Sequence, residues 1–224
     1  WHARDLRLDP SGTDFVVVGP GVEFAARVPM AGGFNVLNAL CAIAAAGEAG
    51  FDPQAVATAI SHTHGVPGRL ESVHAGQAWS AIVDYAHKPD AVQAALQALR
   101  PVTEGKLIVV LGAGGDRDHG KRPLMAAIAA ANADVVIITD DNPRTEDPAT
   151  IRAELLAGVP SDTRAQVVEI GDRREAIAHA VSLAQGSDTV LVAGKGHESG
   201  QEINGVLHPF DDRIVLGEEI GKRL

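Results

Sequence analysis

Residues 106–117 read KLIVVLGAGGDR, and this stretch decides the fold class. The run at 107–111 is apolar at every position, which is typical of a strand buried on both faces, and the glycines that follow end the strand. Similar strands alternate with amphipathic helices along most of the chain. The strands are predicted at 79–85, 106–111, 134–139, 166–170 and 189–193, and the helices at 91–100, 122–131, 148–156, 173–184 and 212–222. This alternation predicts an α/β fold, with a mostly parallel sheet covered by helices on both faces.

The beginning of the chain has another pattern. Strands are predicted at 15–18 and 22–28, a helix at about 34–48, and a second helix that begins after the Asp52–Pro53 cap and ends near His62. The Gly- and Pro-rich segment 65–68 then predicts a boundary between a domain of residues 1–67 and one of residues 68–224. Near the end, Asn204–Gly205 is a hairpin signal, so we expect the last strands to add an antiparallel edge to the sheet.

Composition excludes several classes of protein. Of the 224 residues 46% are hydrophobic and 21% charged, which is too apolar for a disordered chain, and the net charge of -10 argues against a nucleic-acid binder. The longest apolar runs are too short to span a bilayer, so we expect no membrane insertion. The single cysteine, Cys41, cannot form an internal disulfide, which fits a cytoplasmic protein. Because the first residue is Trp1 and not Met, we expect a piece of a longer protein, and the sequence does not indicate an oligomeric state.

Polar and glycine-rich clusters follow four of the predicted strands. Ligands bind at the carboxyl ends of the strands in an open parallel sheet, and those ends share one edge. We therefore expect the four clusters to surround one site. They are Asp84–His87, Gly112–Arg117, Asp140–Arg144 and Gly194–Glu198.

Each cluster also has a purely structural interpretation. The glycines at 112–115 could form a tight turn, but the charged segment after them favours a ligand, and Arg117 can grip a carboxylate through two hydrogen bonds. Asp147 caps the helix at 148, which leaves Arg144 unexplained, and Pro143 would stiffen the turn that presents it. Glu198 could accept an ammonium group, or its segment could be a surface loop.

The cluster at Asp84–His87 points to a nucleotide. Asp84 ends an apolar strand, where a carboxylate suits paired ribose hydroxyls. Its alternative is the cap of the helix after Pro89, a role for which Asp90 competes. Arg69 and Glu71 flank a leucine and are expected to share one face of a short strand, with an exposed ion pair as the plain alternative. The histidines show no metal-ligand spacing, so no metal site is predicted.

Together these motifs resemble the Mur ligase family of ATP-dependent amide-forming enzymes, and within it the diaminopimelate-adding branch. The motifs are GFNVLN (33–38), GRLE (68–71), VDYAHKPD (83–90), GGDRD (114–118), DNPR (141–144) and GKGHE (194–198). The resemblance implies three domains. Residues 1–67 would be the end of the central ATPase domain, and residues 68–224 the C-terminal Rossmann-like domain that binds the incoming amino acid.

The resemblance also implies ligands and roles. The cofactors would be ATP and Mg²⁺, and the substrates a UDP-N-acetylmuramoyl dipeptide and meso-diaminopimelate. Binding of meso-diaminopimelate would fall to Arg117, Asp141, Asn142, Pro143, Arg144, Gly194 and Glu198. Binding of the nucleotide would fall to Asn35, Asn38, Arg69, Asp84 and His87, while the roles of Lys88 and His197 are not assigned.

Other functions stay open at the level of sequence. The parent could be a lysine-adding relative, against which Arg144 argues because lysine has no distal carboxylate, or a ligase similar to folylpolyglutamate synthase. It could also be a binding module without catalysis. The chain contains no phosphate-binding Gly-Lys-Ser/Thr loop, so we expect no ligase activity from these residues alone.

Overall fold

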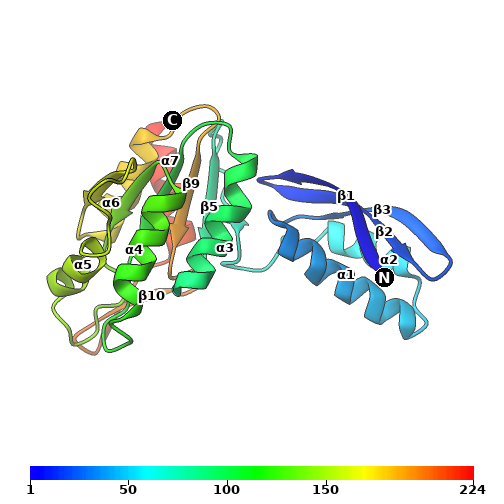
Figure 1. The fold of residues 1–224 in the computed structure, drawn as a ribbon, viewed down its shortest axis with the longest axis horizontal. Coiled ribbons are helices and arrows are strands. Elements are labelled where there is room, and N and C mark those ends of the chain that lie inside the picture. The colour runs from blue at the N-terminus through cyan, green and yellow to red at the C-terminus, as the bar shows by residue number, and fades with distance from the viewer. The chain divides into compact units, whose positions relative to one another are not determined.

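A computed structural model describes residues 1–224, which divide into two compact units, Trp1–Val66 and Pro67–Leu224 (Figure 1). The first unit begins with an antiparallel sheet in the order β1-β2-β3. Its strands are β1 (His2–Asp9), β2 (Gly12–Gly19) and β3 (Val22–Val28), and its helices are α1 (Gly33–Glu48) and α2 (Pro53–Ser61). Strand β1 was not predicted, because nearly all of its residues are exposed and the alternation that marks a half-buried strand is missing.

The core of the first unit lies between the sheet and the two helices. Phe15 and Val17 of β2 pack with Val36 and Ile43 of α1, and all four are almost fully buried. Asp52 caps α2 by accepting a hydrogen bond from the Gln54 amide, as its position before Pro53 predicts.

The second unit contains a six-stranded sheet in the order β4-β5-β9-β6-β7-β8. All neighbours in it are parallel except β4, which is antiparallel to β5. The bounds are β4 (Glu71–Ser72), β5 (Ser80–Asp84), β6 (Leu107–Leu111), β7 (Val135–Ile138), β8 (Gln166–Glu169) and β9 (Thr189–Ala193). The predicted mostly parallel α/β sheet is therefore confirmed.

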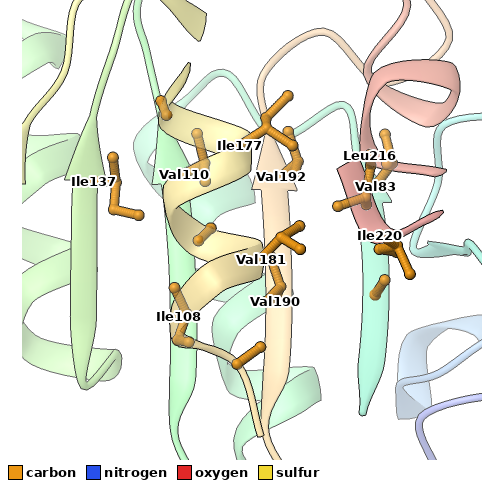
Figure 2. Close-up of a cluster of buried hydrophobic side chains, with 14 of the residues drawn as sticks. Val83, Ile108, Val110, Ile137, Ile177, Val181, Val190, Val192, Leu216 and Ile220 are labelled. Atoms are coloured by element: carbon orange, nitrogen blue, oxygen red, sulfur yellow. The ribbon is translucent and has the colours of Figure 1, made fainter. Parts of the chain in front are cut away.

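Helices cover both faces of this sheet (Figure 1). They are α3 (Pro89–Leu99), which continues into a 3₁₀ turn at Arg100–Val102, α4 (Lys121–Asn132), α5 (Pro148–Leu156), α6 (Arg173–Leu183) and α7 (Asp212–Arg223). Figure 2 shows α6 and α7 on one face, where Ile177 and Leu216 pack against alternate strand residues such as Val110 and Val192. The intervening residues of β5, β6, β7 and β9 are equally buried and face the layer of α3, α4 and α5.

Two expectations about strands are wrong. The hairpin at Asn204–Gly205 exists, but β10 (Gly200–Ile203) and β11 (Val206–Pro209) form a sheet of their own and do not extend the main sheet. The antiparallel edge of the main sheet is β4 instead. Arg69 and Glu71 do not share a strand face, because Leu70 between them has a φ of 40°, which interrupts extended backbone. None of the helices has the length and apolar content needed to cross a bilayer.

Candidate functional site

The carboxyl ends of β5, β6, β7 and β9 surround a cavity of about 530 Å³ in the second unit. Strand β9 lies between β5 and β6, and the helices that follow β6 and β9, α4 and α7, lie on opposite faces of the sheet. Such a divergence leaves a crevice at the strand ends, which is where open α/β sheets bind ligands. The cavity is lined by Tyr85, His87, Lys88, Pro89, Asp90, Gly114, Arg117, Asp118, Lys121, Asp141, Asn142, Arg144, Gly194 and Glu198.

The hairpin of β10 and β11 positions Arg144. The Arg144 amide donates to the Glu202 carbonyl at 3.0 Å, and the Arg144 carbonyl accepts from the Asn204 amide at 2.7 Å. These bonds hold the Arg144 backbone at a φ of 53°, a value that residues other than glycine rarely adopt. Its guanidinium donates from Nη1 to the Gly115 carbonyl at 2.7 Å and pairs through Nε with Glu202 at 3.1 Å. Arg144 is also one of the residues that line the cavity.

The glycines of the 112–115 turn make room for this arrangement. A side chain at Gly114 would place its Cβ 2.9 Å from Arg144 Nη1, and one at Gly115 would place it 1.9 Å from the Pro143 carbonyl oxygen. Arg117 follows in the same turn, and its guanidinium donates to the Asp116 carbonyl at 3.0 Å. Both guanidinium groups thus reach one cavity because the glycine turn packs directly against residues 142–144.

An anionic corner of the cavity lies at the ends of β7 and β9. Asn142 Nδ2 donates to Glu198 Oε2 at 2.9 Å, and both side chains line the cavity. Burial alone would raise the pKa of the Glu198 carboxyl, but the hydrogen bond from Asn142 and the charge of Lys195 outweigh it and hold the pKa below its usual value. Gly194 has a φ of 122°, and any Cβ there would lie 2.5 Å from Asp141 Oδ2.

Asp84 and Arg69 lie beside the cavity without lining it. The Asp84 carboxylate is buried and accepts a hydrogen bond from the Leu70 amide at 2.8 Å. Burial raises the pKa of this carboxyl, and the hydrogen bonds from backbone amides only partly oppose the effect. The helix-cap alternative for Asp84 is wrong, because the N-cap of α3 is Lys88 and no side chain caps that helix.

The Arg69 guanidinium lies over the Tyr85 ring, 5.0 Å from its centroid. Glu71 instead accepts a hydrogen bond from the Gly68 amide at 2.6 Å, so the alternative of an Arg69–Glu71 ion pair is wrong. His87 lines the cavity, and its Nδ1 lies 2.8 Å from the Tyr85 carbonyl oxygen. This group of side chains therefore borders the cavity at the end of β5.

The two remaining predicted nucleotide ligands, Asn35 and Asn38, belong to α1 of the first unit. Asn35 is buried, and its Nδ2 donates to the Ala31 carbonyl at 2.8 Å. Its Oδ1 accepts a hydrogen bond from Nδ2 of the exposed Asn38 at 3.3 Å. Asn35 therefore orients Asn38.

Two lysines at the site were missed by sequence reasoning. Lys121 lines the cavity and donates to the His87 carbonyl at 2.9 Å, and its burial lowers its pKa although Asp141 and Asp118 oppose the shift. Lys195 lies behind the cavity and is fully buried. The signal for both was their place in charged or glycine-flanked segments after strands. No three His, Cys, Asp or Glu side chains of this chain lie close enough together to hold a metal ion, so we assign no Mg²⁺ ligand to it.

Comparisons with known proteins show which family this chain is similar to. The family described as "Mur ligase, glutamate ligase domain" matches residues 68–196. The UDP-N-acetylmuramoyl-L-alanyl-D-glutamate–2,6-diaminopimelate ligase of Streptomyces avermitilis is 56% identical to this chain over 224 residues, and the match covers 98% of this chain and 44% of the relative. The ligase of the same name from Corynebacterium glutamicum is 49% identical over 235 residues, and that match covers 100% of this chain and 45% of the relative. The chain thus spans about half the length of the curated relatives it matches.

Solved structures give the same result. A ligase of the same name superposes with a TM-score of 0.75 at 44% sequence identity, covering 99% of this chain and 45% of that one. Folylpolyglutamate synthase of Mycobacterium tuberculosis superposes with a TM-score of 0.66 at 22% identity over 86% of this chain and 44% of that one, which shows a shared fold alone. With the match over residues 68–196, the parallel sheet and the motifs at its carboxyl edge, the chain belongs to the Mur ligase family.

Proposed function

We propose that this chain is part of an ATP-dependent ligase that joins meso-diaminopimelate to UDP-N-acetylmuramoyl-L-alanyl-D-glutamate. The second unit would bind the amino acid, and the first would be the end of the central ATPase domain. One observation carries the proposal: Arg117, Arg144 and Glu198 line a single cavity at the carboxyl edge of the sheet. The names of the relatives, which specify 2,6-diaminopimelate, support it.

The charges of the cavity match this amino acid. Meso-diaminopimelate carries a carboxylate and an amino group at each end, so its binding site needs cations at separate points and an anion beside them. Arg144 and Arg117 supply planar groups that suit carboxylates. Asp141 and Glu198 supply the negative charge for an ammonium group, with Asn142, Gly194 and the stiff Pro143 turn shaping the pocket around them.

The nucleotide would lie next to this cavity. We assign the ribose hydroxyls to Asp84, the adenine to Asn38 with support from Asn35, and the sugar–phosphate end to Arg69. His87 lines the cavity beside Asp84 and would face the same ligand. A buried carboxylate such as Asp84 forms stronger hydrogen bonds with hydroxyls than an exposed one.

The reaction follows from the chemistry of amide formation. A carboxylate does not react with an amine at neutral pH, so ATP first transfers its γ-phosphoryl group to the D-glutamate side chain, which forms an acyl phosphate and releases ADP. Mg²⁺ would neutralise phosphate charge during this transfer. The neutral amine of diaminopimelate then attacks the acyl carbon, and the tetrahedral intermediate expels phosphate to leave the amide. The residues of this chain would hold the amine in line with the acyl carbon.

A ligation assay with the full-length protein tests the proposal. Radiolabelled meso-diaminopimelate or lysine is incubated with the UDP-linked dipeptide, with and without ATP. We expect ATP-dependent incorporation of meso-diaminopimelate and little incorporation of lysine. Equal use of both amino acids, or incorporation of neither, would contradict the proposal.

A further inference from the structure

Lys195 is a fully buried lysine directly behind the cavity. It follows β9 and Gly194, and its side chain has no exposed surface. Its Nζ donates to Asn142 Oδ1 at 2.9 Å and to Glu198 Oε2 at 3.2 Å, and it lies 3.9 Å from Asp141 Oδ1. Lysine is rarely buried unless its donors are satisfied and its charge is paired. All of its partners belong to the two loops that line the cavity.

These contacts decide how the Asn142 amide is oriented. Asn142 Oδ1 accepts from Lys195 Nζ and also from the Glu202 amide at 3.0 Å. Both of these groups can only donate, so the oxygen of the amide must face them and Nδ2 must face Glu198. In the other orientation Asn142 Nδ2 would face two donors, Lys195 Nζ and the Glu202 amide. Lys195 and the Glu202 amide together therefore hold the one arrangement in which Asn142 donates to Glu198 at 2.9 Å.

The same lysine sets the charge of the anionic corner. Asp141 and Glu198 contribute two carboxylates, and the Lys195 ammonium lies 3.9 Å from the first and 3.2 Å from the second. Of the other cations near these carboxylates, Arg173 is paired with Asp212, and Lys121 lines the cavity, where it interacts with Asp141. Without Lys195 the two carboxylates would repel each other, and Glu198 would bind a proton more readily.

We propose that Lys195 is a positioning residue for the incoming amino acid: it locks the Asn142 amide and keeps Glu198 as an oriented carboxylate, and it does not touch the ligand. Its full burial and its absence from the cavity lining place it behind the residues on which it acts. The inference rests on the proposed function, because it assumes that this cavity binds the amino acid. A simple structural role would instead make Lys195 a link between two loops with no specific effect on amino-acid binding.

The test compares wild-type and Lys195→Met full-length proteins in the ligation assay. We expect the KM for meso-diaminopimelate to rise roughly tenfold or more, as for the loss of a buried charged partner, while the KM for ATP changes by less than about twofold. The acid limb of the pH profile of kcat/KM for the amino acid should move to higher pH, because the pKa of Glu198 rises when Lys195 is lost. Asp141, Arg173 and the Tyr85 hydroxyl, which also face Glu198, stay unchanged in the variant.

A matched control and a second variant complete the test. Lys106→Met removes the same charge at the opposite end of β6, where the lysine is exposed, and should leave both constants and the pH profile unchanged. In a Glu198→Gln background, Lys195→Met should change the KM for the amino acid by less than about twofold, since coupled residues are not additive. This comparison also decides the case in which the single variant fails to fold, because the double variant loses both charges of the pair.

Three results separate the outcomes. If wild-type protein does not incorporate diaminopimelate, the proposed function fails. If wild-type protein is active and folded Lys195→Met keeps its KM and its acid limb, the positioning role is wrong. A large additional rise in KM on adding Lys195→Met to Glu198→Gln would also overturn it.

Discussion

Arg173 and Asp212 form a two-point ion pair in which neither side chain is exposed. Arg173 Nε lies 2.8 Å from Asp212 Oδ1, and Nη2 lies 2.7 Å from Oδ2. The same guanidinium donates to the Ala193 carbonyl at 3.0 Å and to the Asp140 carbonyl at 3.3 Å. The pair thus joins the starts of α6 and α7 to the ends of β7 and β9, from which the cavity loops begin.

Removal of one partner should destabilise the fold strongly. Asp212→Ala leaves the Arg173 charge buried without a counterion, which costs about 3–5 kcal/mol. The control is Glu218→Ala, because Glu218 is 49% exposed and pairs with an Arg174 that is 42% exposed, and such pairs contribute about 0–1 kcal/mol. Urea unfolding of the full-length protein measures both variants. Equal losses for the two variants would contradict the assigned role of the buried pair.

Glu146 predicts a specific dependence of stability on pH. Hydrogen bonds from Arg122 lower the pKa of its carboxyl from 4.5 to about 2. Desolvation has the opposite effect on this pKa, but a smaller one. The folded state therefore binds this proton less tightly than the unfolded state. The stabilisation is present above the unfolded value of 4.5 and is lost as pH falls through the folded value of about 2.

Glu146→Gln should remove this component. We expect a loss of roughly 1.5–3 kcal/mol at neutral pH, as for a hydrogen bond to a charged group, and a shallower fall of stability between the two pKa values. Urea midpoints measured across that pH range provide the check, with the exposed Glu104→Gln as control. A variant with the same slope as wild type would show that Glu146 is not the group that titrates.

The buried elements of the second unit could be predicted from sequence because their signals are local. The run at 107–111 is apolar at every position and the run at 189–193 is apolar after Thr189, and both are strands whose residues are all buried. Asp147 precedes a proline, and it caps α5 by accepting a hydrogen bond from the Ala149 amide. Such features depend on neighbours in the chain and not on the tertiary fold.

The parts that sequence did not predict depend on distant contacts. The sequence predicted the hairpin at Asn204–Gly205. It did not predict the bridge between Ile203 and Arg144, which holds Arg144 at a positive φ. Lys195 was visible in its motif, yet its burial depends on Asn142 and Glu198 coming together from separate loops. Residue type alone favours an exposed lysine.

Gly115 should be intolerant of any side chain. Its Cβ would lie 1.9 Å from the Pro143 carbonyl oxygen, which is backbone and cannot move alone. Gly115→Ala should therefore lose roughly 1–3 kcal/mol of stability and weaken binding of the amino acid, because Arg144 donates to the Gly115 carbonyl. The control is Gly221→Ala in α7, where nothing crowds the position and alanine should gain about 0.5–1 kcal/mol. Wild-type stability and KM in Gly115→Ala would contradict the packing described.

Asp84 should affect the nucleotide and not the amino acid. Asp84→Asn keeps an acceptor for the Leu70 amide, so the local backbone is retained, but one carboxylate oxygen is replaced by a donor. We expect the KM for ATP to rise about tenfold, as for a lost hydrogen bond to a charged group of roughly 1.5 kcal/mol, with the KM for diaminopimelate unchanged. Asp162→Asn, at an exposed position, serves as control. An unchanged KM for ATP would remove Asp84 from the nucleotide site.

Arg144 should decide between meso-diaminopimelate and lysine. The two amino acids differ by one carboxylate at the far end of the side chain, so discrimination requires a group that pairs with that carboxylate. The guanidinium of Arg144 faces the cavity, and its backbone is held by the β10–β11 hairpin. A planar donor group fixed in this way matches a carboxylate through two parallel hydrogen bonds.

Loss of this pair in a largely desolvated pocket should cost about 2–5 kcal/mol, which is roughly 30-fold to several-thousand-fold in specificity. Arg144→Ala should lower the ratio of kcat/KM for meso-diaminopimelate to that for lysine by this factor. Arg144→Lys should recover little, because an ammonium group cannot form two parallel hydrogen bonds and cannot reach the Gly115 carbonyl with the same geometry. Arg164→Ala, outside the cavity lining, controls for loss of a positive charge. A ratio that stays within about twofold of wild type in both Arg144 variants would transfer the role to Arg117, because that arginine also lines the cavity and its guanidinium is bonded only to the Asp116 carbonyl.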